Sequence, residues 1–408
     1  MAVLWLLLLL AGLPTFLLGV FVWVAIQNFL TADIPSTLKH PVKLWFMHCI
    51  GQYLIALGNI LEKLRICAMP RFLQFLISLM PIKKDPNVLA TDMHFGTVPV
   101  RLIKPKAVSS KPRRGIVFYH GGGAIIGSLD SYHGLCSFLA SETDSMVLIV
   151  RYRKLPSYHH PVLANDCLSA TIYFLTHLES FAVDPSRVVL CGESIGGWAV
   201  ATVMQVLTRI LSLPQVQAQV LIQPILNFVN FQLPSYQQSK NVPFLTRDML
   251  FLCLCKYLAI YLSWKDAMLA GAVIPLDKWK KYQKWISHEN IPRRFWRQFS
   301  QPESLGPFNE AAYLESKHIW SAEISPVLAN DKIISQLPKT LLVSCENDIL
   351  RDDVLLYKKR LEDQGVPVNW YHVEDGLRGC IMFLDKKYLS FPCSMKAAKA
   401  VIGYIKGI

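Results

Sequence analysis

A chain of 408 residues has room for one large domain or two of ordinary size. Its formal net charge is +13, but the basic residues are dispersed and no nucleic-acid motif accompanies them, which disfavours a nucleic-acid partner and favours a solvated basic surface or one that faces anionic lipid. The 10 cysteines form no CxxC pair and show no zinc-like spacing with histidine, so the sequence predicts neither a metal site nor a cofactor.

The N-terminus is continuously apolar, and residues 1–26 carry no charged side chain. A helix of this length spans a bilayer. A cleavable signal peptide is the alternative, but no basic residue precedes the apolar run and no clear small-x-small cleavage site interrupts it. We therefore predict a transmembrane signal-anchor over residues 1–26. Flanking charges do not fix its orientation, because Lys39 and Lys43 follow the span and no basic residue precedes it.

Residues 27–110 are predicted to form an N-terminal helical and cap segment that leads into the main domain and ends in short strands such as 98–103. The apolar stretch 44–61 is interrupted by His48, Gln52 and Asn59, which are costly in hydrocarbon. We therefore favour a helix at the membrane surface over a second membrane span or a cap over the core.

From residue 111 onward, predicted strands and helices alternate. Short apolar runs predict strands at 115–119, 146–150, 187–190, 218–222, 340–344 and 368–372. Helical patterns fall at 131–141, 161–179, 198–207, 352–364 and 394–405. This alternation predicts an α/β fold over residues 111–408, with a mostly parallel central sheet and helices on both faces.

The alternation breaks from about residue 227 to 320, where the chain is aromatic, basic and irregular. We predict a helical cap inserted over the carboxyl edge of the sheet. Within it, Trp279, Tyr282 and Trp285 recur at helical spacing with lysines beside them. The plain interpretation is a cap helix packed on the core, and the alternative is a membrane-leaning surface through which an apolar substrate enters.

A Gly-x-Ser-x-Gly sequence lies between the predicted strand 187–190 and the helix that follows it. It consists of Gly192, Glu193, Ser194, Ile195 and Gly196. In this context the sequence is typical of a nucleophile elbow, a strained turn that lifts the serine hydroxyl clear of the sheet. Side chains at the two glycine positions would collide with the neighbouring backbone. Ser194 is therefore the candidate nucleophile.

A second motif, His120-Gly121-Gly122-Gly123, directly follows the first clear strand of the domain. Consecutive glycines at the end of a strand allow backbone N–H groups to converge on one point, as in the oxyanion loop of lipases and esterases. We expect the N–H groups of Gly121, Gly122 and Ile195 to form an oxyanion hole. The alternative is a flexible surface loop.

These motifs, with Tyr152-Arg153-Lys154-Leu155-Pro156 between them, resemble the hormone-sensitive-lipase-like branch of the α/β-hydrolases. The apolar N-terminus narrows the resemblance to arylacetamide deacetylase and its relatives. The segments 309–315 and 344–363 are similar to the arylacetamide deacetylase-like 4 group. The resemblance covers essentially the whole chain and implies the α/β-hydrolase fold with a catalytic triad in the order serine, aspartate, histidine.

Carried over by position, the resemblance makes Ser194 the nucleophile and Asp348 the acidic member of the triad, although Asp348 is also placed to cap the following helix. The family's histidine lies in an Asp-Gly-Phe-His-Gly motif. Here the segment 375–379 reads Asp-Gly-Leu-Arg-Gly, so Arg378 occupies the histidine position. A guanidinium group stays protonated and cannot act as a general base, but it could pair with Asp348.

Other histidines are candidates to substitute for the missing base. His372 lies in a predicted strand, where a packed side chain is the more common role. His133, His159 and His160 follow earlier strands and could approach the mouth of the site, but nothing in the sequence assigns any of them. The sequence therefore predicts a serine site without an evident base.

Two functions follow, together with a third, less favoured one. The first is a membrane-anchored serine hydrolase of the carboxylesterase or deacetylase type, which acts on lipophilic esters or amides, with its turnover in doubt. The second is a catalytically impaired pseudoenzyme that binds acyl or lipid ligands. The third is a membrane-tethered interaction protein that never uses the pocket. By resemblance, the catalytic domain lies in the lumen of the endoplasmic reticulum.

Overall fold

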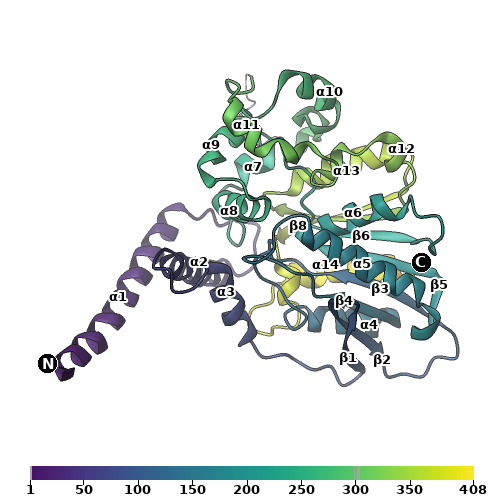
Figure 1. The fold of residues 1–408 in the computed structure, drawn as a ribbon, viewed down its shortest axis with the longest axis horizontal. Coiled ribbons are helices and arrows are strands. Elements are labelled where there is room, and N and C mark those ends of the chain that lie inside the picture. The colour runs from purple at the N-terminus through teal and green to yellow at the C-terminus, as the bar shows by residue number, and fades with distance from the viewer. Residues whose placement is uncertain (1, 298, 301–303) are drawn as a thin grey trace.

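The computed structural model describes the backbone of residues 2–297, 299–300 and 304–408, with side chains from residue 11 onward within these ranges. In this part of the chain, eight strands form one sheet in the order β1-β2-β4-β3-β5-β6-β7-β8 (Figure 1). The strands are β1 (Val88–Phe95), β2 (Val98–Pro105), β3 (Arg113–Tyr119), β4 (Ser145–Val150), β5 (Val183–Glu193), β6 (Ala218–Ile222), β7 (Lys339–Asn347) and β8 (Val368–Leu377). The pairs β1–β2 and β2–β4 are antiparallel, and the other pairs are parallel. The predicted mostly parallel sheet is confirmed.

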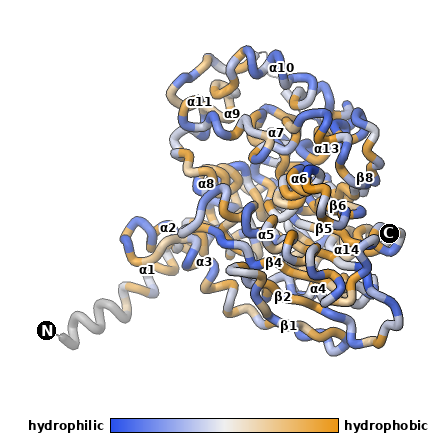
Figure 2. Tube along the Cα trace, turned by 45° about the vertical axis from the view of Figure 1, so that its right-hand side comes forward, coloured by the Kyte–Doolittle hydropathy of each residue, from blue (hydrophilic) through white to orange (hydrophobic). Residues whose placement is uncertain are grey.

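Helices cover both faces of the sheet, because alternate side chains of each central strand enter different cores. In β3, Val117 and Tyr119 belong to one hydrophobic cluster, and Ile116 and Phe118 belong to the other. The first cluster includes residues of α5 (Val162–Thr176), α6 (Ile195–Leu207) and α13 (Arg351–Glu362). The second includes residues of α4 (His133–Thr143) and α14 (Pro392–Lys406). Figure 2 shows the hydrophobic residues concentrated in the sheet between these layers. Burial on both faces explains why the strands read as unbroken apolar runs.

The chain between β6 and β7 forms a group of short helices. They are α7 (Pro234–Gln238), α8 (Arg247–Leu258), α9 (Lys265–Leu269), α10 (Leu276–Ile286), α11 (Glu310–Ser316) and α12 (Asp331–Ile334). Figure 1 shows α7 to α11 gathered at one side of the sheet. Cys253 of α8 lies against the loop after β3, since a Cβ on Gly123 would come within 2.9 Å of its Sγ. These helices therefore cover the end of the sheet where the glycine loop lies.

The aromatic residues of α10 pack inward, in agreement with the plain interpretation of that helix. Tyr282 and Trp285 are half-buried against the core, and the guanidinium of Arg360 lies 3.8 Å from the centre of the Trp285 ring. Lys281 and Lys284 are exposed, and their Nζ atoms lie 4.8 Å and 4.7 Å from the centres of the Tyr282 and Trp285 rings. The aromatic spacing of α10 thus reflects packing on α13.

Three helices precede the sheet. They are α1 (Ala2–Thr31), α2 (Pro41–Lys63) and α3 (Met69–Ser78). Helix α1 extends away from the domain, while its C-terminal half packs on α2 (Figure 1). The ring of Phe21 in α1 lies 5.5 Å from that of Tyr53 in α2. Among the described residues, two helical segments, Ala11–Thr31 and Pro41–Lys63, are long and apolar enough to cross a membrane.

Candidate active site

Ser194 lies at the junction between β5 and α6, as the motif predicts. Its φ and ψ angles are 59° and −118°, a conformation that costs free energy for a residue with a side chain. A Cβ on Gly192 would come within 2.3 Å of the Gly196 oxygen, and a Cβ on Gly196 within 2.1 Å of the Tyr119 oxygen. Glycine is therefore required at both positions for this turn to form.

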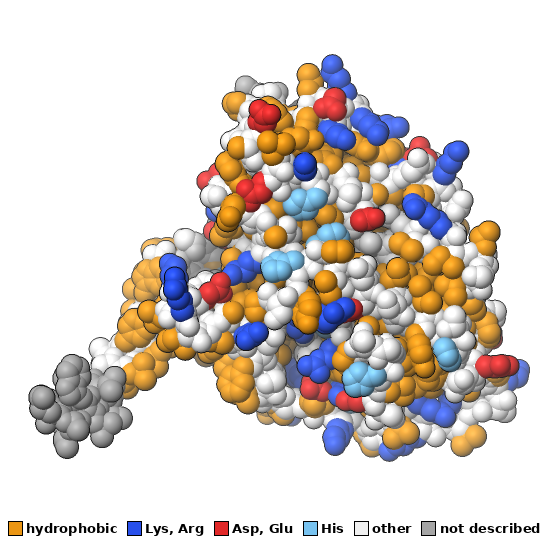
Figure 3. Space-filling model, in the orientation of Figure 1, with side chains coloured by type: hydrophobic (Ala, Val, Ile, Leu, Met, Phe, Trp, Pro, Cys, Tyr) orange, Lys and Arg blue, Asp and Glu red, His pale blue; other side chains and the backbone are white. Residues whose placement is uncertain are grey.

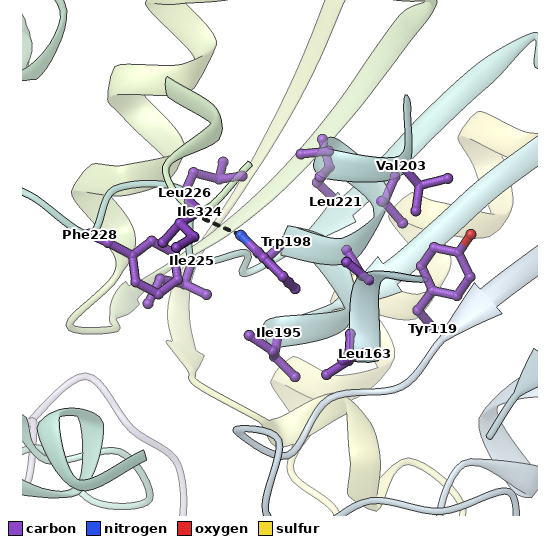
Figure 4. Packing of buried hydrophobic residues seen from close by; sticks show 14 of the residues in the cluster. Tyr119, Leu163, Ile195, Trp198, Val203, Leu221, Ile225, Leu226, Phe228 and Ile324 are labelled. Carbon is purple, nitrogen blue, oxygen red and sulfur yellow. Dashed lines mark hydrogen bonds between the residues drawn. The ribbon is translucent and has the colours of Figure 1, made fainter. Parts of the chain in front are cut away.

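Helix α6 is held firmly behind the serine by a buried tryptophan. Trp198 is fully buried, and its indole N–H donates to the Ile324 oxygen at 2.8 Å (Figure 4). The Phe228 ring meets it edge-on at 6.5 Å. Because Trp198 lies one turn after Ser194, its packing fixes the position of the elbow relative to the cap.

The His120-Gly121-Gly122-Gly123 loop follows β3 and lies beside the elbow. Gly122 and Gly123 have φ angles of +113° and +63°, which side chains rarely tolerate. Both are half-buried, as is Ser194, whereas Gly121 is buried. The loop therefore adopts a backbone conformation that glycine permits, and Gly122 and Gly123 are its partly exposed members.

His120 is a structural member of this loop. It is fully buried, and its Nδ1 lies 2.8 Å from the Gly121 oxygen and 2.9 Å from the Tyr152 hydroxyl. Burial, with a smaller contribution from Lys154, lowers the pKa of His120 to about 3. The imidazole is thus neutral at physiological pH.

Arg378 connects the other two residues of the predicted triad. It follows β8 directly, and Asp348 follows β7. The Arg378 Nη1 group donates to both carboxylate oxygens of Asp348 at 3.1 Å, and Nη2 donates to Ser194 Oγ at 2.7 Å. Asp348 also accepts a hydrogen bond from the Leu350 N–H at 3.0 Å, so it orders the start of the next helical turn as well. The three side chains form one chain of hydrogen bonds, with arginine in the central position.

The charge of Arg378 is compensated within a closed environment. Arg378 is only 5% exposed and Asp348 only 1%. Burial lowers the pKa of Arg378, but the carboxylates of Asp348 and Glu193 raise it more, so the net shift is upward. The guanidinium stays charged, and it can only donate to Ser194 Oγ. It cannot withdraw the serine proton.

Two supporting contacts could not be found from motifs. The Tyr132 hydroxyl donates to Glu193 Oε2 at 2.6 Å, and burial raises the pKa of that glutamate. The Gln223 side chain donates to the Leu377 oxygen and accepts from the Gly379 N–H, both at 3.0 Å. It therefore holds the backbone on both sides of Arg378. The only sequence signal for this role of Gln223 is that it directly follows β6, at the same edge of the sheet as Ser194.

In the described part of the chain, none of the alternative histidines bonds to Ser194. His372 lies in β8, with its nitrogens 2.8 Å from Ser344 Oγ and 2.9 Å from Glu346 Oε2. His133 Nε2 lies 3.4 Å from Ser137 Oγ. His160 packs edge-on against Trp198, and burial lowers its pKa to about 4. His159 lines a pocket beside α8.

Fold and site together define an α/β-hydrolase. The family described as "alpha/beta hydrolase fold" matches residues 116–282 and 287–382. An esterase of Pseudomonas putida has the same fold, with a TM-score of 0.59 and 20% identity over 87% of this chain and 95% of that one. Carboxyl esterase 2 of Tuber melanosporum is similar, with a TM-score of 0.59 and 21% identity over 81% and 89%.

Curated relatives identify the branch. Human arylacetamide deacetylase-like 4 is 60% identical over the full length of both chains. Bovine arylacetamide deacetylase is 32% identical over 89% of this chain and 93% of its own. Mouse neutral cholesterol ester hydrolase 1 is 31% identical over 86% and 88%. The chain belongs to the arylacetamide deacetylase-like 4 group, in the hormone-sensitive-lipase-like branch of the α/β-hydrolase esterases.

Proposed function

We propose that this protein is a membrane-anchored relative of these esterases that binds lipophilic acyl esters, amides or related lipids at Ser194 and turns them over poorly or not at all. One observation carries the proposal: Arg378 donates to Ser194 Oγ at 2.7 Å and pairs with Asp348 in the place where a general base is needed. A base must accept the serine proton as the hydroxyl attacks the carbonyl carbon. Guanidinium cannot do so, and its N–H engages a serine lone pair that attack requires.

Binding is supported by the parts of the site that remain. The glycine loop lies beside Ser194, and Gly122 and Gly123 are the half-buried members. Their N–H groups, with that of Ile195, are the better candidates for holding a carbonyl oxygen than the N–H of the buried Gly121. Names of relatives at 31% to 32% identity refer to a deacetylase and a cholesterol ester hydrolase, which supports a lipophilic ester or amide as the ligand.

The second candidate is an active hydrolase with ordinary turnover. It is favoured by the presence of Ser194 in the strained elbow conformation, together with the glycine loop and the buried Asp348. It requires that a base reach Ser194 after Arg378 moves aside. The two functions differ in rate, because loss of one triad member typically lowers turnover on the order of 10⁴-fold or more.

The deciding experiment compares hydrolysis of a short-chain nitrophenyl ester and labelling by a fluorophosphonate for the native chain and Ser194→Ala. We expect the native chain to hydrolyse the ester no faster than Ser194→Ala and to label weakly. Binding of a non-hydrolysable ether analogue, measured by quenching of tryptophan fluorescence, would remain. Serine-dependent hydrolysis at ordinary esterase rates would overturn the proposal in favour of the second candidate.

The proposed location is the membrane of the endoplasmic reticulum, with α1 as a single-pass anchor and the catalytic domain in the lumen. The anchor is supported by the apolar composition and exposed position of α1. Lumenal placement rests on resemblance to the family alone.

A further inference from the structure

Helices α2 and α3 and the short segments that follow them expose large apolar side chains that no other described part of the chain covers. These side chains, from 38% to 78% exposed, are Val42, Phe46, Ile50, Leu64, Ile66, Phe75, Leu79 and Ile82. We call these residues the α2–α3 face. Figure 3 shows hydrophobic side chains gathered over the arm that α1 and α2 form, with basic side chains beside them. Single exposed apolar residues are ordinary, but eight large ones on two neighbouring helices and the segments that follow them mark a site of contact.

The opposite side of α2 is attached to the domain at both ends of the helix. Near its start, Leu44 is fully buried, and Lys43 Nζ donates to the Ser390 oxygen. At its end, Glu62 accepts hydrogen bonds from Lys256 Nζ at 2.5 Å and from the Met69 N–H at 2.7 Å. The helix therefore lies along the domain instead of leaving it to cross a bilayer. Its stripe of Val42, Phe46 and Ile50, each four residues from the next, faces outward.

The packing of α1 sets the depth of this face relative to a membrane. Helix α1 has 30 residues, whereas about 20 residues cross the hydrocarbon core of a bilayer. The contacts to α2 come from the C-terminal half of α1, where the Phe21 ring lies 5.5 Å from the Tyr53 ring and the Leu17 oxygen accepts from the Tyr53 hydroxyl at 3.4 Å. When α1 is inserted, α2 is therefore held at the bilayer beside the C-terminal half of the anchor.

Charge complementarity indicates what kind of surface the α2–α3 face meets. A pocket of about 310 Å³ lies at the α2–α3 turn and is lined by Glu62, Arg65, Ile66, Cys67, Ala68 and Arg71. The Glu62 carboxylate is already paired with Lys256. Arg71 Nη2 donates to Ser157 Oγ at 3.4 Å, and within the described residues neither Arg65 nor Arg71 forms an ion pair. The pocket thus presents two cationic groups among exposed apolar side chains, an arrangement that matches lipid phosphates above acyl chains.

We propose that the α2–α3 face docks on a phospholipid surface, with its apolar side chains at the boundary of the acyl chains and Arg65 and Arg71 against lipid phosphates. This inference rests on the proposed membrane anchor. Docking holds the hydrolase domain against the bilayer, so that a second pocket, of about 360 Å³ between α2, α3 and α8, faces lipid. The inserted α1 helix and the docked α2–α3 face then fix the orientation of the domain on the membrane, which α1 alone would leave free to rotate.

The test uses the full chain in vesicles of phosphatidylcholine and phosphatidylserine. The background is Cys67→Ser, because the other native cysteines are buried. In each variant one cysteine replaces Leu13, Phe46, Phe75 or Val108 and is labelled with bimane. Lipids that carry a nitroxide at a known depth then quench the bimane fluorescence. We expect Leu13→Cys to be quenched best by a nitroxide near the chain end, and Phe46→Cys and Phe75→Cys by one near the headgroup. Val108, 99% exposed and outside the face, serves as the unquenched control. If Phe46→Cys and Phe75→Cys behave like Val108→Cys while Leu13→Cys is quenched, the docking proposal fails and the anchor stands. If Leu13→Cys is also unquenched, the anchor fails too.

A charge-reversal pair tests the arginines. Arg65→Glu with Arg71→Glu is compared with Lys332→Glu with Lys399→Glu, which makes the same change in net charge at exposed positions outside the face. We expect the first pair to reduce headgroup-level quenching at Phe75→Cys by more than half, and the second pair to leave it unchanged. If neither pair reduces the quenching, the role given to Arg65 and Arg71 is wrong. If both pairs reduce it to the same extent, that role is also wrong, because the effect then depends only on total charge.

Discussion

Arg378 binds Ser194 and Asp348 at once, with its Nη2 group 2.7 Å from the serine Oγ and its Nη1 group 3.1 Å from each carboxylate oxygen. Arg378 thus still links the nucleophile to the acidic residue, but it is a hydrogen-bond donor where the triad needs a proton acceptor. A histidine in this place accepts a proton from serine, whereas arginine only donates. The buried carboxylate, which would stabilise a transient imidazolium, here neutralises a permanent cation.

Arg378→His is expected to restore part of the missing activity. The substitution places an imidazole beside Asp348, and the Gln223 contacts to Leu377 and Gly379 that hold this segment use backbone atoms that remain. Rescue should be partial, because histidine is shorter than arginine and the surroundings are packed around the longer side chain. The measurement is kcat/KM for a short-chain nitrophenyl ester.

Arg378→Gln is the matched control, since it removes the charge without supplying a base. It should stay inactive, as should Arg378→His combined with Ser194→Ala. An equal gain in Arg378→Gln would show that relief of the ion pair, and not the base, limits turnover.

Asp348→Asn should destabilise the fold by about 3–5 kcal/mol, because it removes the carboxylate that the buried guanidinium of Arg378 contacts. Adding Arg378→Gln to that variant should recover much of the loss, since the two side chains are in direct contact. Urea unfolding of the single and double variants measures the coupling. Strictly additive effects would mean that the ion pair contributes little to stability.

The steric requirement for glycine at position 192 of the elbow can be tested by comparison with a glycine in a helix. Gly192→Ala places a methyl group about 2.3 Å from the Gly196 oxygen, and the fold should lose about 3 kcal/mol or more in free energy of unfolding. A Cβ on Gly403, in α14, would meet no heavy atom within 4 Å, so Gly403→Ala should be neutral or stabilise by about 0.5–1 kcal/mol. Similar thermal midpoints for the two variants would contradict the steric account.

Much of this architecture could be predicted from the sequence, because local patterns determine it. The strands of a sheet buried on both faces read as apolar runs, and the glycines at 122, 192 and 196 mark the turns where backbone approaches backbone. The oxyanion assignment stays a prediction, although burial of Gly121 favours Gly122 and Gly123. The resemblance places Arg378 in the triad with Ser194 and Asp348, but it does not predict the hydrogen bond from Arg378 to Ser194 Oγ. Nothing in the sequence predicts the contact between Tyr132 and Glu193, which are 61 positions apart and meet only in the fold.

The buried His120 should make the protein sensitive to acid. Its folded pKa of about 3 lies below the value of about 6.5 for an unfolded chain, so the unfolded state binds more protons between these pH values. Stability contributed by the neutral imidazole is therefore present above pH 6.5 and falls as the pH is lowered, by at most about 1.4 kcal/mol per pH unit. His120→Asn keeps a side-chain N–H for the Gly121 oxygen but does not titrate, so its urea midpoint should depend less on pH in this range. An unchanged slope would assign the acid sensitivity to other groups, such as His160.

The orientation of the domain can be read from one added glycan. The natural sequence contains no Asn-x-Ser/Thr site, and Val108, which is 99% exposed, precedes Ser109 and Ser110. Val108→Asn therefore creates an acceptor site on an accessible loop with a single substitution. If the domain is lumenal, expression in mammalian cells should give a band that glycosidase treatment shifts back to the mobility of the native chain. Adding Ser110→Ala removes the acceptor and should abolish the shift. A chain that stays unmodified while a lumenal reporter in the same cells is glycosylated would place the domain in the cytosol, where a serine site of this family would meet a different pool of lipid esters.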